Sequence, residues 1–243
     1  INAFLQDIPH ALLIPGTSGV GASTVAKHMA GQLSDTVLTV LPEKDEVVDL
    51  EKGTITVALV RRLYEQTRTK TDRRVIVIDY AERMAAQAQN AFLKLLEEPT
   101  PGVIFLLVTQ QPQKLLPTVR SRAQMLEILP ISQKQLADLL DELNITDATK
   151  RTQLLYMASG LPAELSRLAA DTEYFDRKAQ IVRDARDLVQ AGTYQKLKIA
   201  HTYKDSREDC LLMVNVSMKM VRHAMTTDPQ PAHARQLEQL LSA

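Results

Sequence analysis

A glycine-rich loop constrains this chain more than any other segment. Residues 15–24 read Pro-Gly-Thr-Ser-Gly-Val-Gly-Ala-Ser-Thr, between an apolar run and a segment with helical spacing. The phosphate-binding pattern Gly-x-x-x-x-Gly-Lys-Ser/Thr is matched at Gly16, Gly21 and Ser23, but Ala22 stands in place of the lysine. Because that lysine offsets charge on the β- and γ-phosphates, the loop predicts an ATPase scaffold without ATPase activity.

The same loop offers backbone and hydroxyl groups to a phosphate. Glycines such as Gly19 let N–H groups turn inward at the start of a helix, and Ser23, followed by Thr24, could ligate Mg²⁺. The alternative is a tight turn in which Ser23 caps the helix. Lys27 cannot replace the missing lysine, because five positions along a helix rotate it by about 140°, toward solvent.

The composition indicates a soluble globular protein. The chain has 243 residues and a formal net charge of zero, with 45% hydrophobic and 24% charged residues, which favours one or two domains. Neutral charge argues against indiscriminate binding to nucleic acid or membranes. The single cysteine, Cys210, excludes an intrachain disulfide and is expected to be a small buried hydrophobe.

The sequence predicts neither a metal site nor a membrane segment. The histidines are scattered, and the longest apolar run, Val103–Val108, is much shorter than the ~20 residues that a membrane helix needs. The first residues lack the basic and apolar regions of a signal peptide. A cytoplasmic location is therefore expected, in keeping with the cysteine usage.

Strands and helices alternate through the first half of the chain. This order predicts a parallel sheet covered on both faces, with its ligand crevice beyond the carboxyl ends of the strands. The expected strands are 11–14, 37–41, 75–78, 103–109 and 124–128, and the expected helices are 23–33, 55–66, 90–98 and 115–120.

Two polar residues end the central strands of that predicted sheet. Asp79 stands where P-loop ATPases hold magnesium, but the next residue is Tyr80 rather than a glutamate that activates water. Glu82 is not expected to substitute for that glutamate. Asp79 could also cap a helix that begins near Ala81. Thr109 could bond a γ-phosphate or a water, or else satisfy its own backbone.

The second half of the chain reads as helices only. Ser132 is the expected N-cap of a helix to Leu143, Arg151–Ser159 forms a second helix closed by Gly160, and Pro162 begins a third that ends at Ala170. From Asp171 onward the pattern is helical. Breaks are expected near Gly192 and near Pro229–Pro231.

An arginine pair, Arg120 and Arg122, lies where the last expected helix of the sheet domain ends. An arginine fork suits a phosphate, and arginine fingers act in trans in several ATPases. Taken singly, each arginine is better explained by solvated surface charge.

Together these motifs identify a family. Over about residues 10–130 the chain resembles the clamp-loader branch of the AAA+ ATPases. The motifs that carry the resemblance are Gly16–Thr24, Asp79–Met84, Asn90-Ala-Phe-Leu-Lys-Leu-Leu-Glu-Glu-Pro99, Phe105–Gln110 and Leu116-Pro-Thr-Val-Arg-Ser-Arg122.

The resemblance implies three domains and a role for Arg122. It predicts an α/β AAA+ core over 1–130, a small helical lid over 131–170 and an all-helical, collar-like domain over 171–243, which is short for the family. Arg122 matches the arginine that the family presents in trans to ATP on a neighbouring subunit. The family's Ser-Arg-Cys reads Ser-Arg-Ala here, ending at Ala123.

The resemblance also implies a nucleotide site that has lost its function. Ala22, Tyr80 and Ala163 replace the lysine, the catalytic glutamate and a sensing arginine of the lid, and no cysteine of a zinc knuckle lies between Ser34 and Thr56. We expect no required cofactor and little or no binding of Mg-ATP. The degenerate site comprises Gly16, Gly19, Gly21, Ser23, Thr24, Asp79 and Thr109.

The expected partners follow from the same family. They are a tau/gamma-type clamp-loader ATPase and a delta-type subunit, with the sliding clamp and primed DNA reached through the complex. Two other hypotheses remain open at this point: an active P-loop ATPase or kinase with a lysine-less loop, and an AAA+-derived adaptor outside replication.

Overall fold

The computed structural model describes residues 8–68 and 73–227. The chain divides into two compact units, 1–166 and 167–243, which are described separately below. The finer division into three domains remains a prediction. The break expected near Pro229–Pro231 and the first seven residues of the predicted core lie outside the described residues.

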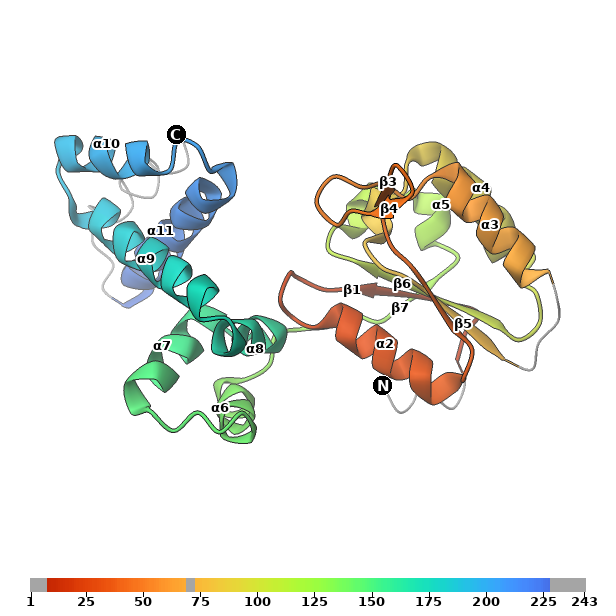
Figure 1. The fold of residues 1–243 in the computed structure, drawn as a ribbon, viewed down its shortest axis with the longest axis horizontal. Helices are drawn as coiled ribbons and strands as arrows, with labels where there is room; N and C mark the ends of the chain where they lie inside the picture. Colours follow the sequence, from red (N-terminus) through yellow and green to blue (C-terminus); the bar gives the residue numbers. More distant parts are fainter. Residues whose placement is uncertain (1–7, 69–72, 228–243) are drawn as a thin grey trace. The chain divides into compact units, whose positions relative to one another are not determined.

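The first unit is built on a five-stranded parallel sheet of strand order β2-β5-β6-β1-β7 (Figure 1). The predicted α/β class is confirmed, and the central strands are apolar on both faces. Strand β2 ends one residue earlier than expected and β7 three residues earlier, although Ile128 still forms an isolated bridge to Gly16. The strands are β1 (Ala11–Pro15), β2 (Val37–Val40), β5 (Arg74–Ile78), β6 (Val103–Thr109) and β7 (Gln124–Met125).

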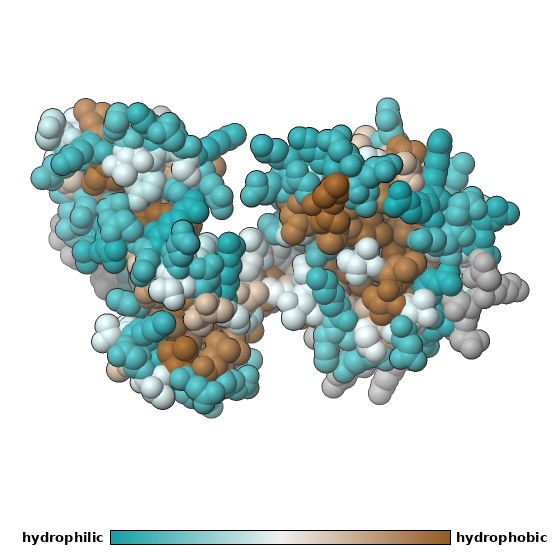
Figure 2. Space-filling view, viewed as in Figure 1, coloured by the Kyte–Doolittle hydropathy of each residue, from teal (hydrophilic) through white to brown (hydrophobic). Residues whose placement is uncertain are grey.

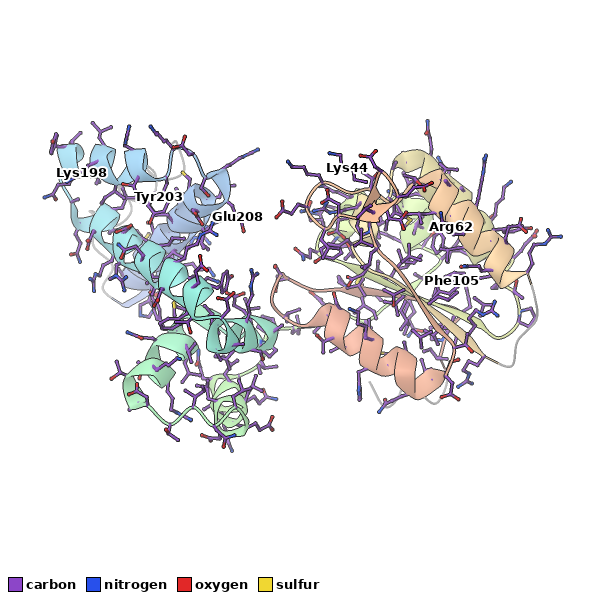
Figure 3. All side chains as sticks on the ribbon, in the orientation of Figure 1. Lys44, Arg62, Phe105, Lys198, Tyr203 and Glu208 are labelled. Atoms are coloured by element: carbon purple, nitrogen blue, oxygen red, sulfur yellow. The ribbon has the colours of Figure 1, made fainter. Side chains whose placement is uncertain are left out.

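Helices cover both faces of this sheet, because alternate strand residues point to opposite sides. Leu12 and Ile14 pack toward α2 (Ala22–Leu33), whereas Leu13 packs toward the other face. On that face the rings of Phe92 and Phe105 pack edge to face, with their centroids 5.2 Å apart. Phe105 is labelled in Figure 3. The helices of that second face are α3 (Val57–Thr67), α4 (Ala86–Glu97) and α5 (Pro117–Arg120).

Several local elements differ from those predicted. Helix α4 begins at Ala86 rather than at Asn90, after an N-cap alanine that makes no side-chain cap bond. A hairpin of β3 (Glu43–Lys44) and β4 (Val47–Val48) was not expected. Two single 3₁₀ turns, η1 (Ala81–Arg83) and η2 (Pro112–Lys114), follow β5 and β6.

Short helices complete the first unit and begin the second. Helix α6 (Gln133–Glu142) starts with the predicted Ser132 cap, reinforced by Gln135 as a capping box. Helix α7 (Ala148–Ala158) begins three residues before the predicted Arg151, because the Asp147 side chain caps it. Gly160 closes α7 at a φ of 89°, and α8 has the predicted bounds Pro162–Ala170.

The second unit consists of helices α9 (Thr172–Gln190), α10 (Thr193–Thr202) and α11 (Arg207–Thr227). The predicted break near Gly192 is confirmed, since Gly192 is the N-cap of α10. The hydroxyl of Tyr203 donates to Asp184 Oδ2 at 2.5 Å (Figure 3). Cys210 is half-buried rather than buried, and packs against the small core around Ile181.

On the face shown in Figure 2, hydrophilic residues cover much of both units, and hydrophobic residues are exposed there in groups. Among residues 8–68 and 73–227, no helix is both long enough and apolar enough to cross a bilayer.

Candidate functional site

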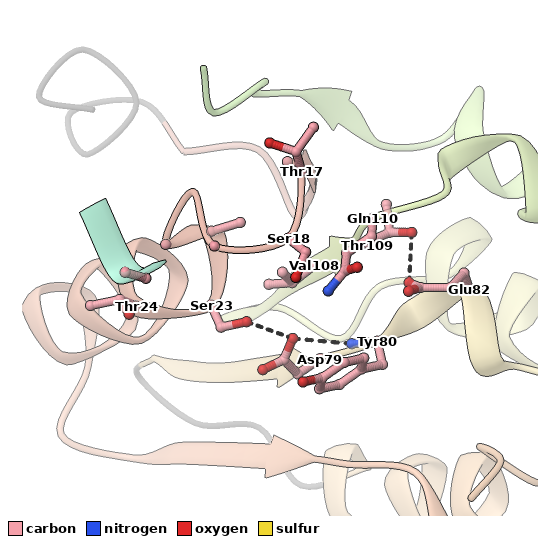
Figure 4. A pocket seen from close by; sticks show the side chains of 15 residues that line it. Thr17, Ser18, Ser23, Thr24, Asp79, Tyr80, Glu82, Val108, Thr109 and Gln110 are labelled. Carbon is pink, nitrogen blue, oxygen red and sulfur yellow. Dashed lines mark hydrogen bonds between the residues drawn. The ribbon is translucent and has the colours of Figure 1, made fainter. Parts of the chain in front are cut away.

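A polar pocket lies beyond the carboxyl ends of β1, β5 and β6, where the sequence predicted a ligand crevice (Figure 4). Its volume is about 170 Å³, below the roughly 300–1,000 Å³ of typical small-molecule sites. All seven residues of the predicted nucleotide site line it. The lining residues are Gly16, Thr17, Ser18, Gly19, Gly21, Ala22, Ser23, Thr24, Asp79, Tyr80, Glu82, Val108, Thr109, Gln110 and Ala163.

The glycine loop forms one wall of this pocket. Gly19 and Gly21 have φ angles of 83° and 90°, a backbone conformation that favours glycine. Gly21 is the N-cap of α2, so the predicted alternative in which Ser23 caps the helix is wrong. The amide of Gly16 donates to the Thr109 carbonyl at 3.1 Å, which ties the loop to the end of β6.

Ser23 and Asp79 face each other across the pocket floor (Figure 4). Ser23 Oγ donates to Asp79 Oδ1 at 2.8 Å, and the Tyr80 amide donates to the same oxygen at 3.1 Å. Asp79 does not cap the turn at Ala81 as predicted, because Tyr80 is the N-cap of η1 and no side chain caps it. The serine–aspartate pair of a P-loop site is therefore assembled.

Glu82 lines the pocket, although no role was expected for it from the sequence. Tyr80 adopts a left-handed φ of 55°, and the η1 turn that follows places Glu82 beside β6. The Thr109 hydroxyl donates to Glu82 Oε2 at 2.7 Å and accepts from the Gln111 amide at 3.1 Å. The hydroxyl thus bonds both a carboxylate and the backbone.

The charge of this pocket suits a nucleoside triphosphate poorly. Asp79 and Glu82 contribute carboxylates, whereas none of the described residues that line the pocket is a lysine or an arginine. Lys27 lies exposed on α2, as predicted. Because the β- and γ-phosphates would meet no cationic side chain here, the residues present fit Mg-ATP poorly, although Ser23 and Asp79 are groups that can hold Mg²⁺.

The start of α8 closes one side of the glycine loop. The amides of Ala163 and Glu164 donate to the Gly19 carbonyl at 3.0 and 3.2 Å. A Cβ added at Gly19 would lie 2.9 Å from the Glu164 Cβ. Ala163 therefore lies in the pocket wall and offers no charge there.

Arg122 lies outside this pocket, just after α5. Its Nη2 contacts Glu97 Oε1 at 2.7 Å, and its Nη1 donates to the Thr118 carbonyl at 3.0 Å. The side chain keeps 36% of its surface exposed. Arg120 on the same turn is exposed.

A buried glutamine that the sequence analysis missed fixes the loop that leads to Arg122. Gln89 of α4 is only 3% exposed. Its Nε2 donates to the carbonyls of Met84 and Lys114 at 3.0 and 3.2 Å, and its Oε1 accepts from the Leu116 amide at 2.6 Å. The only feature of the sequence that pointed to Gln89 was the presence of a polar residue inside the run Ala88–Leu96.

Comparisons with known proteins show what this chain is similar to. The family model described as "DNA polymerase III, delta subunit" matches residues 36–132. The chain is 32% identical over 120 residues to DNA polymerase III subunit delta' of Bacillus subtilis. It is 31% identical over 204 residues to the same subunit of Pseudomonas aeruginosa. The chain is similar to DNA polymerase III subunits of the clamp-loader family.

The match to these clamp-loader relatives is partial in length. The alignments cover 49% of this chain and 36% of the Bacillus relative, and 74% and 62% for the Pseudomonas relative. The chain therefore spans between about one third and two thirds of the relatives' length. The resemblance to the clamp-loader family seen in the sequence is confirmed, with similarity to delta' subunits.

A solved structure supports the AAA+ fold. The chain superposes on a DNA polymerase III gamma subunit-related protein of Thermotoga maritima with a TM-score of 0.51 and 17% identity, covering 99% of this chain and 88% of that one. Such a likeness shows the fold alone.

In the part of the chain that the structure describes, no group of three or more His, Cys, Asp and Glu could hold a metal ion.

Proposed function

We propose that this chain is a delta'-like clamp-loader subunit of DNA replication that hydrolyses no ATP itself and supplies Arg122 in trans to ATP on a neighbouring subunit. The proposal rests on two features that lie apart in the first unit, the pocket and Arg122. The pocket that would hold ATP has no cationic side chain among its described lining residues, while a partly exposed arginine lies outside it, paired to Glu97.

The chemistry assigned to Arg122 is electrostatic. A guanidinium held beside a neighbour's γ-phosphate stabilises the charge that develops in phosphoryl transfer, and its N–H fork matches the phosphate oxygens. The proposed partners are a tau/gamma-type ATPase and a delta-type subunit. Through them the chain would act on the sliding clamp and primed DNA in the cytoplasm.

The decisive experiment is DNA-stimulated ATP hydrolysis by the complex reconstituted with the tau/gamma-type and delta-type subunits of the same organism. Arg122→Ala is expected to slow hydrolysis at the adjoining site by about 10³–10⁵-fold. Measuring how much ATP the complex hydrolyses in the first turnover separates the contribution of that site from the contributions of the other ATP sites. Arg120→Ala, on the same turn, is the matched control and should change the rate far less.

Unchanged hydrolysis in an assembled Arg122→Ala complex would remove the arginine from the mechanism. Failure of the wild-type chain to assemble with clamp-loader subunits would instead favour an adaptor outside replication. Size-exclusion chromatography of each mixture separates these outcomes.

One observation favours a second candidate, an active P-loop ATPase or kinase. The hydrogen bond between Ser23 and Asp79 retains a pair that holds Mg²⁺ in such enzymes. Calorimetric titration of the isolated chain with Mg-ATP tests this function. Tight binding that Asp79→Ala abolishes would support it, and no binding at millimolar ATP would exclude it.

A further inference from the structure

The ion pair between Arg122 and Glu97 joins two rigid elements of the first unit. Glu97 is the last residue of α4 and directly follows the buried Leu95 and Leu96. Arg122 follows the buried Val119 of α5, which belongs to the same core cluster. Because both backbones are fixed by packing, the 2.7 Å contact between Glu97 Oε1 and Arg122 Nη2 sets where the guanidinium lies.

Glu97 is not explained by the stability of its own helix. The C-terminus of a helix carries partial negative charge, so an acidic residue in the last turn is unfavourable there. Here Glu97 ends α4 and Glu98 caps it, which puts two acids at the wrong end. The contact with Arg122 gives Glu97 a role that the helix does not.

The geometry leaves the arginine available to a partner. Nη2 of the guanidinium contacts Glu97 and Nη1 donates to the Thr118 carbonyl, while the Arg122 and Glu97 side chains remain 36% and 48% exposed. Ion pairs this exposed are weak and exchange readily. The contact can therefore restrict the rotamers of Arg122 without preventing its approach to a phosphate of greater negative charge.

We propose that Glu97 is a positioning residue for Arg122, holding the guanidinium in the orientation from which it reaches ATP on the neighbouring subunit. This inference rests on the proposed trans-acting role of Arg122. The acidic end of α4 would then contribute to the catalytic rate at the neighbouring site. It would not contribute to nucleotide affinity there, since the neighbour's own loop binds the ATP. A small misplacement of a catalytic group is enough to lower a rate substantially.

The test compares Glu97→Ala with Glu98→Ala in the reconstituted complex. Both variants remove one negative charge from the same helix end, but only the first removes the carboxylate that contacts Arg122. We expect Glu97→Ala to lower kcat at the adjoining site about tenfold with KM for ATP unchanged, and Glu98→Ala to leave both near wild type. Glu97→Gln, which keeps an acceptor, should fall between them.

A double variant separates this inference from the proposed function. If Glu97 acts through Arg122, then Glu97→Ala/Arg122→Ala hydrolyses ATP no more slowly than Arg122→Ala alone. Equal rates for Glu97→Ala and Glu98→Ala, with Arg122→Ala still defective, would overturn the positioning role and leave the trans-acting role intact. A faster Glu97→Ala complex would also overturn it, because Glu97 would then restrain the arginine. No effect of Arg122→Ala would refute the proposed function itself.

Discussion

Ser23 Oγ donates a 2.8 Å hydrogen bond to Asp79 Oδ1 across the pocket, and the loop residue that precedes Ser23 is Ala22. The pair that would hold magnesium is therefore intact, while the charge that would hold the phosphates is missing. Since hydroxyl and carboxylate groups alone offer a triphosphate no compensating charge, the site retains P-loop geometry without its main source of affinity.

Restoring that charge is expected to restore nucleotide affinity in part. Ala22→Lys places an ammonium in the pocket, and a charge-assisted bond of about 1.5–3 kcal/mol corresponds to roughly 10- to 100-fold tighter Mg-ATP binding by calorimetry. Hydrolysis should stay at background, because Tyr80 still occupies the position of the catalytic glutamate. Ala22→Met, of similar length without the charge, should bind as weakly as wild type; equal gains in both variants would contradict the electrostatic explanation.

Two glycines of the first unit should respond oppositely to alanine. Gly19 has a φ of 83° and a Cβ there would lie 2.9 Å from the Glu164 Cβ, so Gly19→Ala is expected to destabilise the chain by about 1–2 kcal/mol or more. Gly31 lies inside α2 with nothing within 4 Å of an added Cβ. Gly31→Ala should therefore stabilise by about 0.5–1 kcal/mol.

Urea unfolding followed by circular dichroism measures both glycine changes. Hydrogen exchange should show faster opening of the glycine loop and of the start of α8 in Gly19→Ala only. Equal stability of the two variants would mean that neither the positive φ of Gly19 nor the close approach of Glu164 constrains this position.

The sheet was predictable because its signals are local. The runs 75–78 and 103–109 are apolar on both faces, as strands covered by helices must be, and three strand ends brought their predicted residues to one edge. The hairpin of β3 and β4 had no such signal. Its turn residues, Asp45 and Glu46, adopt positive φ angles of 53° and 64° without the glycine or asparagine that usually marks such a turn.

The site was predictable only where a motif carried it. Glu82 reaches Thr109 because Tyr80 takes a left-handed conformation, which is rare for a tyrosine and has no sequence signature. The contact between Glu97 and Arg122 joins residues on separate elements, and tertiary packing of α4 against α5 creates it. Helix periodicity alone places neither residue beside the other.

Removal of the buried Gln89 side chain should destabilise the first unit. Gln89→Ala leaves the Leu116 amide and the Met84 and Lys114 carbonyls without that partner, and each buried polar group left unpaired costs about 1–3 kcal/mol. We expect a loss of about 3 kcal/mol or more in urea unfolding. Gln87→Ala, an exposed glutamine of the same helix, should cost well under 1 kcal/mol. Similar losses for both variants would mean that water satisfies these groups.

The stability of the second unit should fall with pH in the range where Tyr203 ionises in the unfolded chain. Burial, together with the hydrogen bond to Asp184, raises the pKa of Tyr203 above its usual value of about 10. Above pH 10 the unfolded chain releases this proton while the folded chain keeps it. Stability is therefore fully present below about pH 10 and lost as the pH rises, by up to about 1.4 kcal/mol per pH unit from this group.

Tyr203→Phe isolates that contribution. At neutral pH it should cost about 1–2 kcal/mol, because the 2.5 Å bond to the Asp184 carboxylate is lost. Above pH 10 its stability should fall less steeply than that of wild type, so the two curves converge. Tyr194→Phe in the same unit, at a side chain that is 81% exposed, should keep the wild-type slope. Chemical unfolding at several pH values from 8 to 11 measures all three slopes, and parallel curves for wild type and Tyr203→Phe would show that Tyr203 keeps no raised pKa in the folded chain.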